Sequence, residues 1–98
     1  MPKFVMLIRY TDEGVRHFKD FRSRLDHARR GADELGVTVE SFHLTMGEYD
    51  AVAVIDAPDL KTAAKLSLIN AANGRVRTVT MPAFNEEESA ELASELPS

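Results

Sequence analysis

The residues best suited to chemistry surround a predicted turn in the stretch HLTMGEYDAVAVI. If Gly47 and Glu48 form a two-residue hairpin loop, Thr45 pairs with Asp50 across the two strands. His43 then lies diagonal to Asp50, within reach of its carboxylate. A carboxylate that orients an imidazole makes a general base, able to take a proton from an enol or a phenol. We therefore name His43 and Asp50 as the candidate catalytic pair.

Each candidate also has a structural interpretation, which the sequence leaves open. His43 can instead be held by hydrogen bonds in a dimer interface, and Asp50 can accept backbone N–H groups of the turn. Arg9 ends an otherwise apolar segment, so it should reach either an acid such as Asp50 or an anionic ligand. Thr45 and Tyr49 complete the candidate ligand-binding set with Arg9. The alternative for Tyr49 is a place under a helix edge with its hydroxyl in water.

The sequence predicts neither a cofactor nor a metal site. It has no cysteine, so thiolate ligands and thiolate nucleophiles are absent. His17 and His27 fall on one predicted helix, where their Cα atoms rise about 15 Å apart, too far to share an ion. The chain has no His-x-x-x-His pair, no calcium-loop spacing and no glycine-rich phosphate loop.

Composition restricts the class of protein. Ninety-eight residues predict one domain over 1–98, and 44% hydrophobic with 29% charged residues predict a folded chain. The net charge of -4, with acids interleaved among the basic residues of 16–30, argues against a nucleic-acid partner. We expect a cytoplasmic protein without a membrane partner, because the chain lacks both a signal peptide and an apolar stretch of about 20 residues.

Hydrophobic periodicity gives the elements of the first half. Residues 3–10, KFVMLIRY, form an apolar run that is typical of a strand covered on both faces. An amphipathic helix follows, capped at Thr11 or Asp12, broken near Asp20 and ended by Gly36. The two strands of the hairpin then occupy 37–46 and 49–56.

The second half repeats this order. Pro58 opens a second long helix, which Asn73-Gly74 ends. Its predicted buried stripe consists of Leu60, Ala63, Ala64, Ser67, Leu68 and Ala71. The last strand covers 75–81 and ends at Pro82, and Asn85 with Glu88 caps a terminal acidic helix within 85–98 that ends near Leu96.

This order predicts an α+β fold. The sequence βαββαβ forms a ferredoxin-like, four-stranded antiparallel sheet of order 4-1-3-2, with two helices on one face plus a C-terminal helix. The hairpin pairing assigns alternate residues to the two faces of that sheet. Under the helices it places Phe42, Leu44, Met46, Tyr49, Ala51, Ala53 and Ile55, and on the helix-free face Ser41, His43, Thr45, Asp50, Val52 and Val54.

The helix-free face predicts self-association. Val52 and Val54, joined by Val5 and Leu7, would stand in water there, at a cost of about 1.5 to 3 kcal/mol each. Contiguous exposed apolar patches usually mark contact sites. We therefore expect a homodimer or higher homo-oligomer in which two sheets stack face to face as a dimeric α+β barrel. Alternatively, the terminal helix or the loops cover this face within a monomer.

The stretch LTMGEYDAVAVIDAPD resembles the GYD domain family, which is named for the residues found here as Gly47, Tyr49 and Asp50. The likeness extends to YTDEGVRHFKD near the start and to NGRVRTVTMPAF near the end, and so covers the chain to about Phe84. At Phe21-Arg22 the sequence departs from the family's Ser-Pro pair. The resemblance implies a small ferredoxin-like protein that is dimeric in the manner of the α+β barrel group, and it assigns no reaction.

Three functional hypotheses follow. The first is a small-molecule-binding or protein-interaction module that takes a small hydrophobic or anionic ligand or another protein. The second is a cofactor-independent isomerase or monooxygenase acting on a small enolic or aromatic substrate, with His43 as general base and Asp50 orienting it. It rests on the wider architecture, which is similar to that of cofactor-independent monooxygenases and muconolactone isomerases. The third is an interaction protein whose sheet edges assemble it further.

Overall fold

Nine elements follow one another along the chain in a computed structural model that describes residues 1–98. The first half contains β1 (Lys3–Tyr10), α1 (Asp12–Arg16), the 3-10 helix η1 (Phe18–Asp20), α2 (Phe21–Glu34) and β2 (Thr38–Leu44). The second half contains β3 (Ala51–Asp56), α3 (Leu60–Ala72), β4 (Val76–Ala83) and α4 (Glu86–Glu95). The predicted βαββαβ order with a terminal helix is confirmed.

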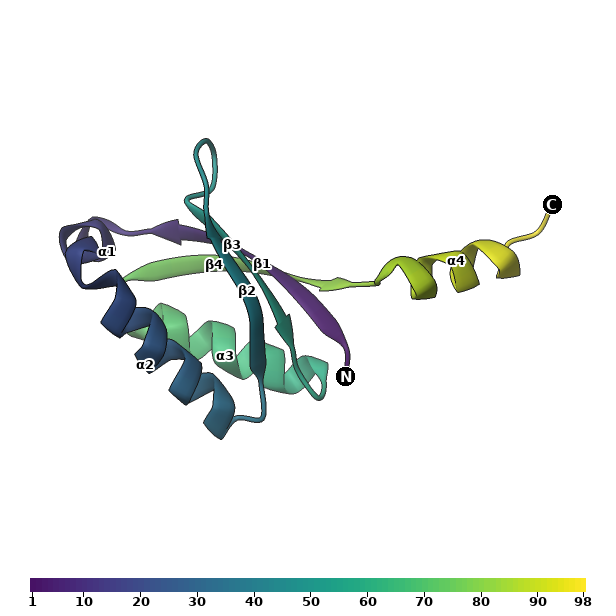
Figure 1. Ribbon diagram of the computed structural model, residues 1–98, viewed down its shortest axis with the longest axis horizontal. Helices are drawn as coiled ribbons and strands as arrows, with labels where there is room; N and C mark the ends of the chain where they lie inside the picture. The colour runs from purple at the N-terminus through teal and green to yellow at the C-terminus, as the bar shows by residue number, and fades with distance from the viewer.

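The four strands form one antiparallel sheet of order β2-β3-β1-β4, which is the predicted order in reverse. Figure 1 shows α2 and α3 side by side under the same face of this sheet, while the other face has no helix over it. The ferredoxin-like α+β fold is therefore confirmed. Within the chain, β1 is covered on one face only: Phe4, Met6 and Ile8 are buried, and the residues between them are half-buried.

The β2–β3 hairpin has the predicted pairing near its turn. Leu44 faces Ala51, His43 faces Val52 and Phe42 faces Ala53. Farther from the turn the register shifts at a β-bulge, where Glu40 is the extra residue. The bulge keeps both Val39 and Phe42 against the core, although they stand three residues apart instead of two. Regular alternation along residues 37–46 does not predict this bulge.

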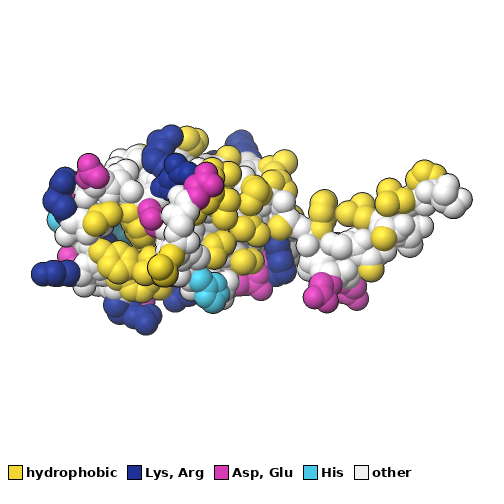
Figure 2. Space-filling model, turned by 90° about the horizontal axis from the view of Figure 1, so that it is seen from above, with side chains coloured by type: hydrophobic (Ala, Val, Ile, Leu, Met, Phe, Trp, Pro, Cys, Tyr) yellow, Lys and Arg dark blue, Asp and Glu magenta, His cyan; other side chains and the backbone are white.

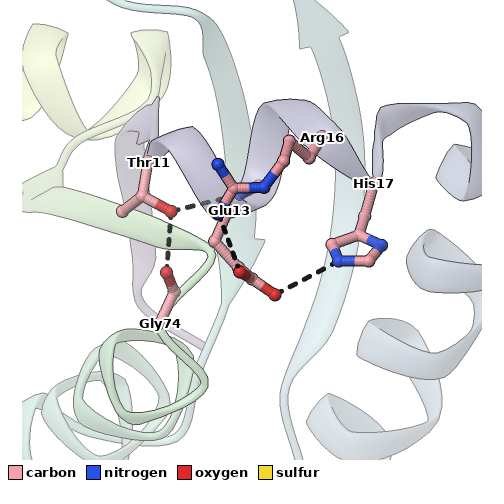
Figure 3. Close-up of polar contacts among 6 residues, drawn as sticks. Thr11, Glu13, Arg16, His17 and Gly74 are labelled. Carbon is pink, nitrogen blue, oxygen red and sulfur yellow. Dashed lines mark hydrogen bonds and ion pairs between the residues drawn. The ribbon is translucent and has the colours of Figure 1, made fainter.

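The entry to the first helical segment is fixed by Thr11 and Gly14. Thr11 Oγ1 accepts the Gly14 N–H at 3.1 Å. The same hydroxyl donates to the Gly74 carbonyl at 2.7 Å, as Figure 3 shows. Thr11 N–H also donates to the Arg75 carbonyl. Gly14 packs so closely on Arg75 that a Cβ atom there would lie 2.2 Å from the same carbonyl oxygen. This segment breaks at η1, near Asp20 as predicted.

Helix α3 differs from the prediction in its start and in its buried side. Its N-cap is Asp59, whose side chain accepts the Thr62 N–H at 2.8 Å, so Pro58 precedes the cap instead of opening the helix. Ala63 and Leu66 are its buried residues, whereas the side chains of Leu60 and Leu68 are 66% and 70% exposed. The predicted stripe was therefore wrong for Leu60, Leu68 and also Ala64, which is exposed. Apolar residues occur all round this helix, so its periodicity does not single out one face.

The end of the chain leaves the body of the fold. Strand β4 continues through Pro82 to Ala83, two residues beyond the predicted end. Asn85 and Glu88 form the predicted capping box at the start of α4, each side chain accepting the other residue's backbone N–H. In Figure 1, α4 projects beyond the sheet and lies over neither of its faces.

Candidate functional site

The hairpin turn is a six-residue loop over residues 45–50, so the predicted two-residue loop of Gly47 and Glu48 was wrong. Thr45 closes it, since its N–H donates to the Asp50 carbonyl at 2.8 Å and its hydroxyl donates to the Tyr49 carbonyl at 2.7 Å. Gly47 has a φ of 115°, a conformation that side-chain-bearing residues rarely adopt. Thr45, predicted as a ligand contact, thus has a structural partner in the loop.

Arg9 and Tyr49 lie against each other at the base of this loop. The guanidinium carbon of Arg9 is 4.8 Å from the centroid of the Tyr49 ring, a cation–π arrangement. Arg9 Nη2 also donates to Glu48 Oε1 at 3.1 Å. Of the two predicted alternatives for Arg9, the structure contains the acid partner, and that acid is Glu48. Tyr49 lies beside Arg9 and not under the helices, because the long loop takes it out of the regular alternation of the strand.

A small hollow adjoins this pair on the helix-free side. It has a volume of about 170 Å³ and is lined by Arg9, Tyr49, Arg77, Thr78 and Val79. Arg9 and Arg77 face each other across β1 and β4. The volume is below the roughly 300 Å³ at which small-molecule pockets begin. The hollow has room for a single side chain or a carboxylate group.

Asp50 joins the loop to the sheet. Its N–H donates to the Ile8 carbonyl, and its Oδ2 accepts the Tyr10 N–H, both at 2.8 Å. These two bonds extend the β1–β3 pairing by one step. Burial raises the pKa of the Tyr10 hydroxyl, and the nearby Asp50 charge adds to that rise. The structure therefore gives Asp50 a backbone N–H partner, as the structural interpretation expected, but at Tyr10 instead of within the turn.

His43 lies apart from this network. It faces Val52 from β2, its side chain is exposed, and no hydrogen bond joins it to Asp50. The structure therefore brings Arg9, Thr45 and Tyr49 together around the loop and leaves His43 without a partner. The catalytic pairing of His43 with Asp50 stays a prediction.

A set of six hydrophobic residues, called the apolar band below, crosses the helix-free face. Val5 of β1 stands opposite Val54 and Met81, and Leu7 stands opposite Val52 and Val79. The side chains of Val79 and Met81 are 46% and 40% exposed, and the other four are half-buried. Figure 2 looks onto this side and shows hydrophobic side chains gathered next to the start of the C-terminal arm. The band comprises Val5, Leu7, Val52, Val54, Val79 and Met81.

Charged groups lie at both ends of the apolar band. Arg9 and Arg77 occupy the end near the hairpin loop. At the other end Lys3 Nζ donates to Glu40 at 2.7 Å and to Asp56 at 2.9 Å. The hydrogen bond to Glu40, followed by that to Asp56, raises the pKa of Lys3. The hairpin pattern predicts four of these residues, and the two that β4 adds, Val79 and Met81, were not predicted.

A second polar cluster belongs to α1. Figure 3 shows the Glu13 carboxylate between Arg16 and His17, at 3.2 Å and 3.1 Å. The Arg16 hydrogen bond, and then the His17 charge, lower the pKa of Glu13. All three residues lie within one helical turn and its end, an arrangement that stabilises a short helix. No group of three His, Asp or Glu residues in the chain is arranged to hold a metal ion, and no helix has the length and apolar character of a membrane span.

The comparison with protein families agrees with the loop and the sheet just described. The model of the GYD domain matches residues 4–93. The chain belongs to the GYD domain family. A relative from Thermus thermophilus is 32% identical over 85 residues, which cover 86% of this chain and 90% of the relative. That relative is named glutamine synthetase and cystathionine beta-lyase binding protein. No solved structure matches the chain.

Proposed function

We propose that this GYD domain protein is a protein-interaction module that works as a homodimer, with the apolar band as its self-association surface. The observation that carries the proposal is the uncovered band. Its six hydrophobic side chains come from three strands, and α2, α3 and α4 all lie elsewhere (Figure 1). Contiguous apolar surface of this kind usually marks a protein contact.

The layout of the helix-free face supports a two-fold contact. Its centre is apolar and its two ends carry the Arg9–Arg77 pair and the Lys3 cluster. An apolar core with a polar rim is the usual anatomy of a protein interface. A stable dimer buries roughly 800 Å² per partner, which is about an eighth of the 6868 Å² surface of the chain. One face of a four-stranded sheet can supply that area.

A second surface is available for a different protein. Leu92 of α4 and Leu96, the C-cap residue that follows the helix, stand about one turn apart, and both are exposed, as is the preceding Phe84. Five glutamates occupy other positions of the same helix. A projecting helix with exposed leucines can dock these side chains in a hydrophobic groove of a partner. Because the Thermus relative is named for two enzymes that it binds, we assign α4 to an enzyme contact, with glutamine synthetase and cystathionine beta-lyase as first candidates.

The dimer is tested by measuring mass in solution. Size-exclusion chromatography with light scattering at micromolar concentration should give twice the 10.9 kDa chain mass. The Val54→Lys variant, changed at the centre of the band, should give the single-chain mass because a buried unpaired charge is costly. The matched control is Leu68→Lys, which places the same charge on the exposed side of α3 and should remain a dimer. A wild-type protein at the single-chain mass would refute the dimer.

The enzyme contact is tested separately with purified glutamine synthetase and cystathionine beta-lyase on a biosensor surface. We expect at least one of them to bind the wild-type protein, and we expect the Leu92→Glu/Leu96→Glu variant to bind at least about tenfold more weakly. Ser94→Glu, two residues from Leu92 and off its side of the helix, is the control and should bind normally. If the protein is dimeric and neither enzyme binds, the enzyme assignment fails and the self-association stands.

A further inference from the structure

A large cavity lies on the opposite side of the sheet from the apolar band. It lies between the sheet, α2 and α3 and opens to solvent, and its volume is about 730 Å³. Ile8 and Ala53 contribute from the sheet, Leu25 and Ala28 from α2, and Leu66 from α3. The volume falls within the roughly 300 to 1,000 Å³ of small-molecule sites. None of the predicted site residues around the hairpin loop lines it.

The cavity remains open because the side chains around it are small and the two helices stand apart. Ala28, Gly31 and Ala32 follow one another on the cavity side of α2, and Ala53 lies on the sheet below. Helix α3 packs mainly on β4, and α2 mainly on β2. Apolar side chains that line such an opening face water and lack the dispersion contacts of a packed core. An apolar occupant would restore those contacts.

Two arginines line the cavity with unsatisfied donors. Arg24 of α2 and Arg75 before β4 each have a buried Nε that makes no hydrogen bond, and neither side chain forms an ion pair. Asp20 and Glu34 also line the cavity, but neither bonds to these arginines. Buried polar atoms almost always have a partner, and a guanidinium stays charged. An anionic ligand would supply the acceptor that both Nε atoms lack.

Both arginines belong to the same end of the cavity. Arg75 adjoins Tyr10, since a Cβ atom built at Gly14 lies within 3.2 Å of backbone or ring atoms of both. From Tyr10 a row of touching rings runs through Phe18 to Phe21, with centroids 5.6 and 5.4 Å apart. Arg24 stands one helical turn after Phe21, on the same side of α2. Arg24, Arg75 and the aromatic rings thus lie toward the end of the cavity where α2 begins, and the aliphatic residues Leu25, Ala28 and Leu66 line the space beyond them, with His27, Arg30 and Glu34 farther along α2.

We propose that this cavity binds a small amphipathic carboxylate, with its carboxylate at Arg24 and Arg75 and its apolar body among the aliphatic side chains between the sheet and the helices. Arginine is suited to this because its planar donors match the two carboxylate oxygens. The site is separate from both protein contacts of the proposed function and does not depend on them. The inference extends that function by adding a ligand class.

The test is a titration of the isotopically labelled wild-type protein with octanoate, followed by side-chain methyl chemical shifts. We expect saturable shifts for cavity residues such as Ala28 and Leu66, and none for Val5 and Val54 on the other face. Octanol, which has the same apolar chain without the charge, should bind at least about tenfold more weakly. This comparison needs no variant and so does not depend on how any variant folds.

Two variants test whether Arg24 and Arg75 are the arginines that bind the carboxylate. Arg24→Gln/Arg75→Gln should weaken octanoate binding at least about tenfold with a well-dispersed spectrum retained, since the side-chain Nε atoms it removes make no hydrogen bond within the fold. The control is Arg22→Gln, an exposed arginine of α2 that does not line the cavity and should leave binding unchanged. The proposal is overturned by an absence of shifts up to millimolar octanoate, by shifts confined to the helix-free face, or by equal affinity for octanoate and octanol.

Discussion

Replacing Gly14 by alanine tests the contact between α1 and the start of β4. The added Cβ would lie 2.2 Å from the Arg75 carbonyl oxygen, 3.1 Å from its carbonyl carbon and 3.2 Å from Tyr10 Cδ1. The first two atoms are backbone, so no side-chain rotation can relieve the overlap. The segment carrying α1 must move away from Arg75.

The sign of the expected effect is unusual for a helix. Within a helix a Gly→Ala change ordinarily stabilises by roughly 0.5 to 1 kcal/mol. Here overpacking should cost about 1 to 3 kcal/mol. Moving α1 also strains the Thr11 bonds to the Arg75 and Gly74 carbonyls, at 3.0 and 2.7 Å, each worth about 0.5 to 1.5 kcal/mol. We expect a net loss of about 2 to 3 kcal/mol.

The loss is measurable by circular dichroism during thermal and urea unfolding. For a domain of this size each 1 kcal/mol shifts Tm by about 4 to 8 °C, so Gly14→Ala should lower Tm by about 8 to 24 °C. All variants are compared at one protein concentration, because self-association would make Tm depend on it. The matched control is Gly31→Ala in α2, where an added Cβ meets no atom within 4 Å.

Gly31→Ala should raise stability by about 0.5 to 1 kcal/mol, as a helix interior normally does. The two alanine variants should therefore move in opposite directions. If Gly14→Ala stabilises the protein as Gly31→Ala does, then α1 does not pack on Arg75 in the way described.

Two further predictions concern helix caps. The Thr62 N–H lowers the pKa of Asp59, so its charge stabilises the fold above the unfolded pKa of 3.8, and this contribution is lost as pH falls through the lower folded value. The urea midpoint should therefore drop more steeply from about pH 5 to about pH 2 in wild type than in Asp59→Asn, and parallel curves would contradict this. In α4, Asn85→Ala removes the capping box with Glu88. It should cost about 1 kcal/mol of local helix stability and speed amide exchange at Ser89 about fivefold, whereas an unchanged exchange rate would count against the cap.

The sheet was largely predictable from the sequence because several signals agree there. The alternation of AVAVI with the residues before Gly47 fixes the register of β2 on β3 near the turn, and the structure confirms the pairs Leu44–Ala51 and Phe42–Ala53. Glycine at positive φ ends both long helices, as Gly36 and Gly74 do here. The hairpin register and the helix ends are determined by residues that are close together in the sequence, so they can be predicted from a single sequence.

The bulge had a sequence signal that simple alternation misses. Val39 and Phe42 both belong on the core side, yet Glu40 and Ser41 stand between them as two consecutive polar residues. A regular strand would turn one of the two hydrophobic residues to the other face. The extra residue at the bulge resolves this conflict, so a break in alternation should be taken as evidence for a bulge.

The candidate site was less predictable because it depends on loop geometry and on distances between elements. The sequence named Arg9, Thr45 and Tyr49, which do meet, but it could not show that Glu48 is the acid that Arg9 reaches. It gave no sign of the cavity under the helices. A cavity depends on how far α2 stands from α3. Small side chains such as Ala28 and Ala53 occur both where elements pack closely and where space is left between them, so their positions in the sequence do not reveal a cavity.

The two outer strands limit how copies of this chain can join. Strand β2 has its bulge at Glu40, and β4 includes Pro82, which has no N–H to offer to an added strand. Both borders of the sheet are therefore poor templates for lateral growth, which disfavours open-ended fibres and strand exchange. In a dimer whose two sheets stack through their helix-free faces, each chain buries the face that it uses for the contact. No such face is left for a third copy, so association ends at two chains.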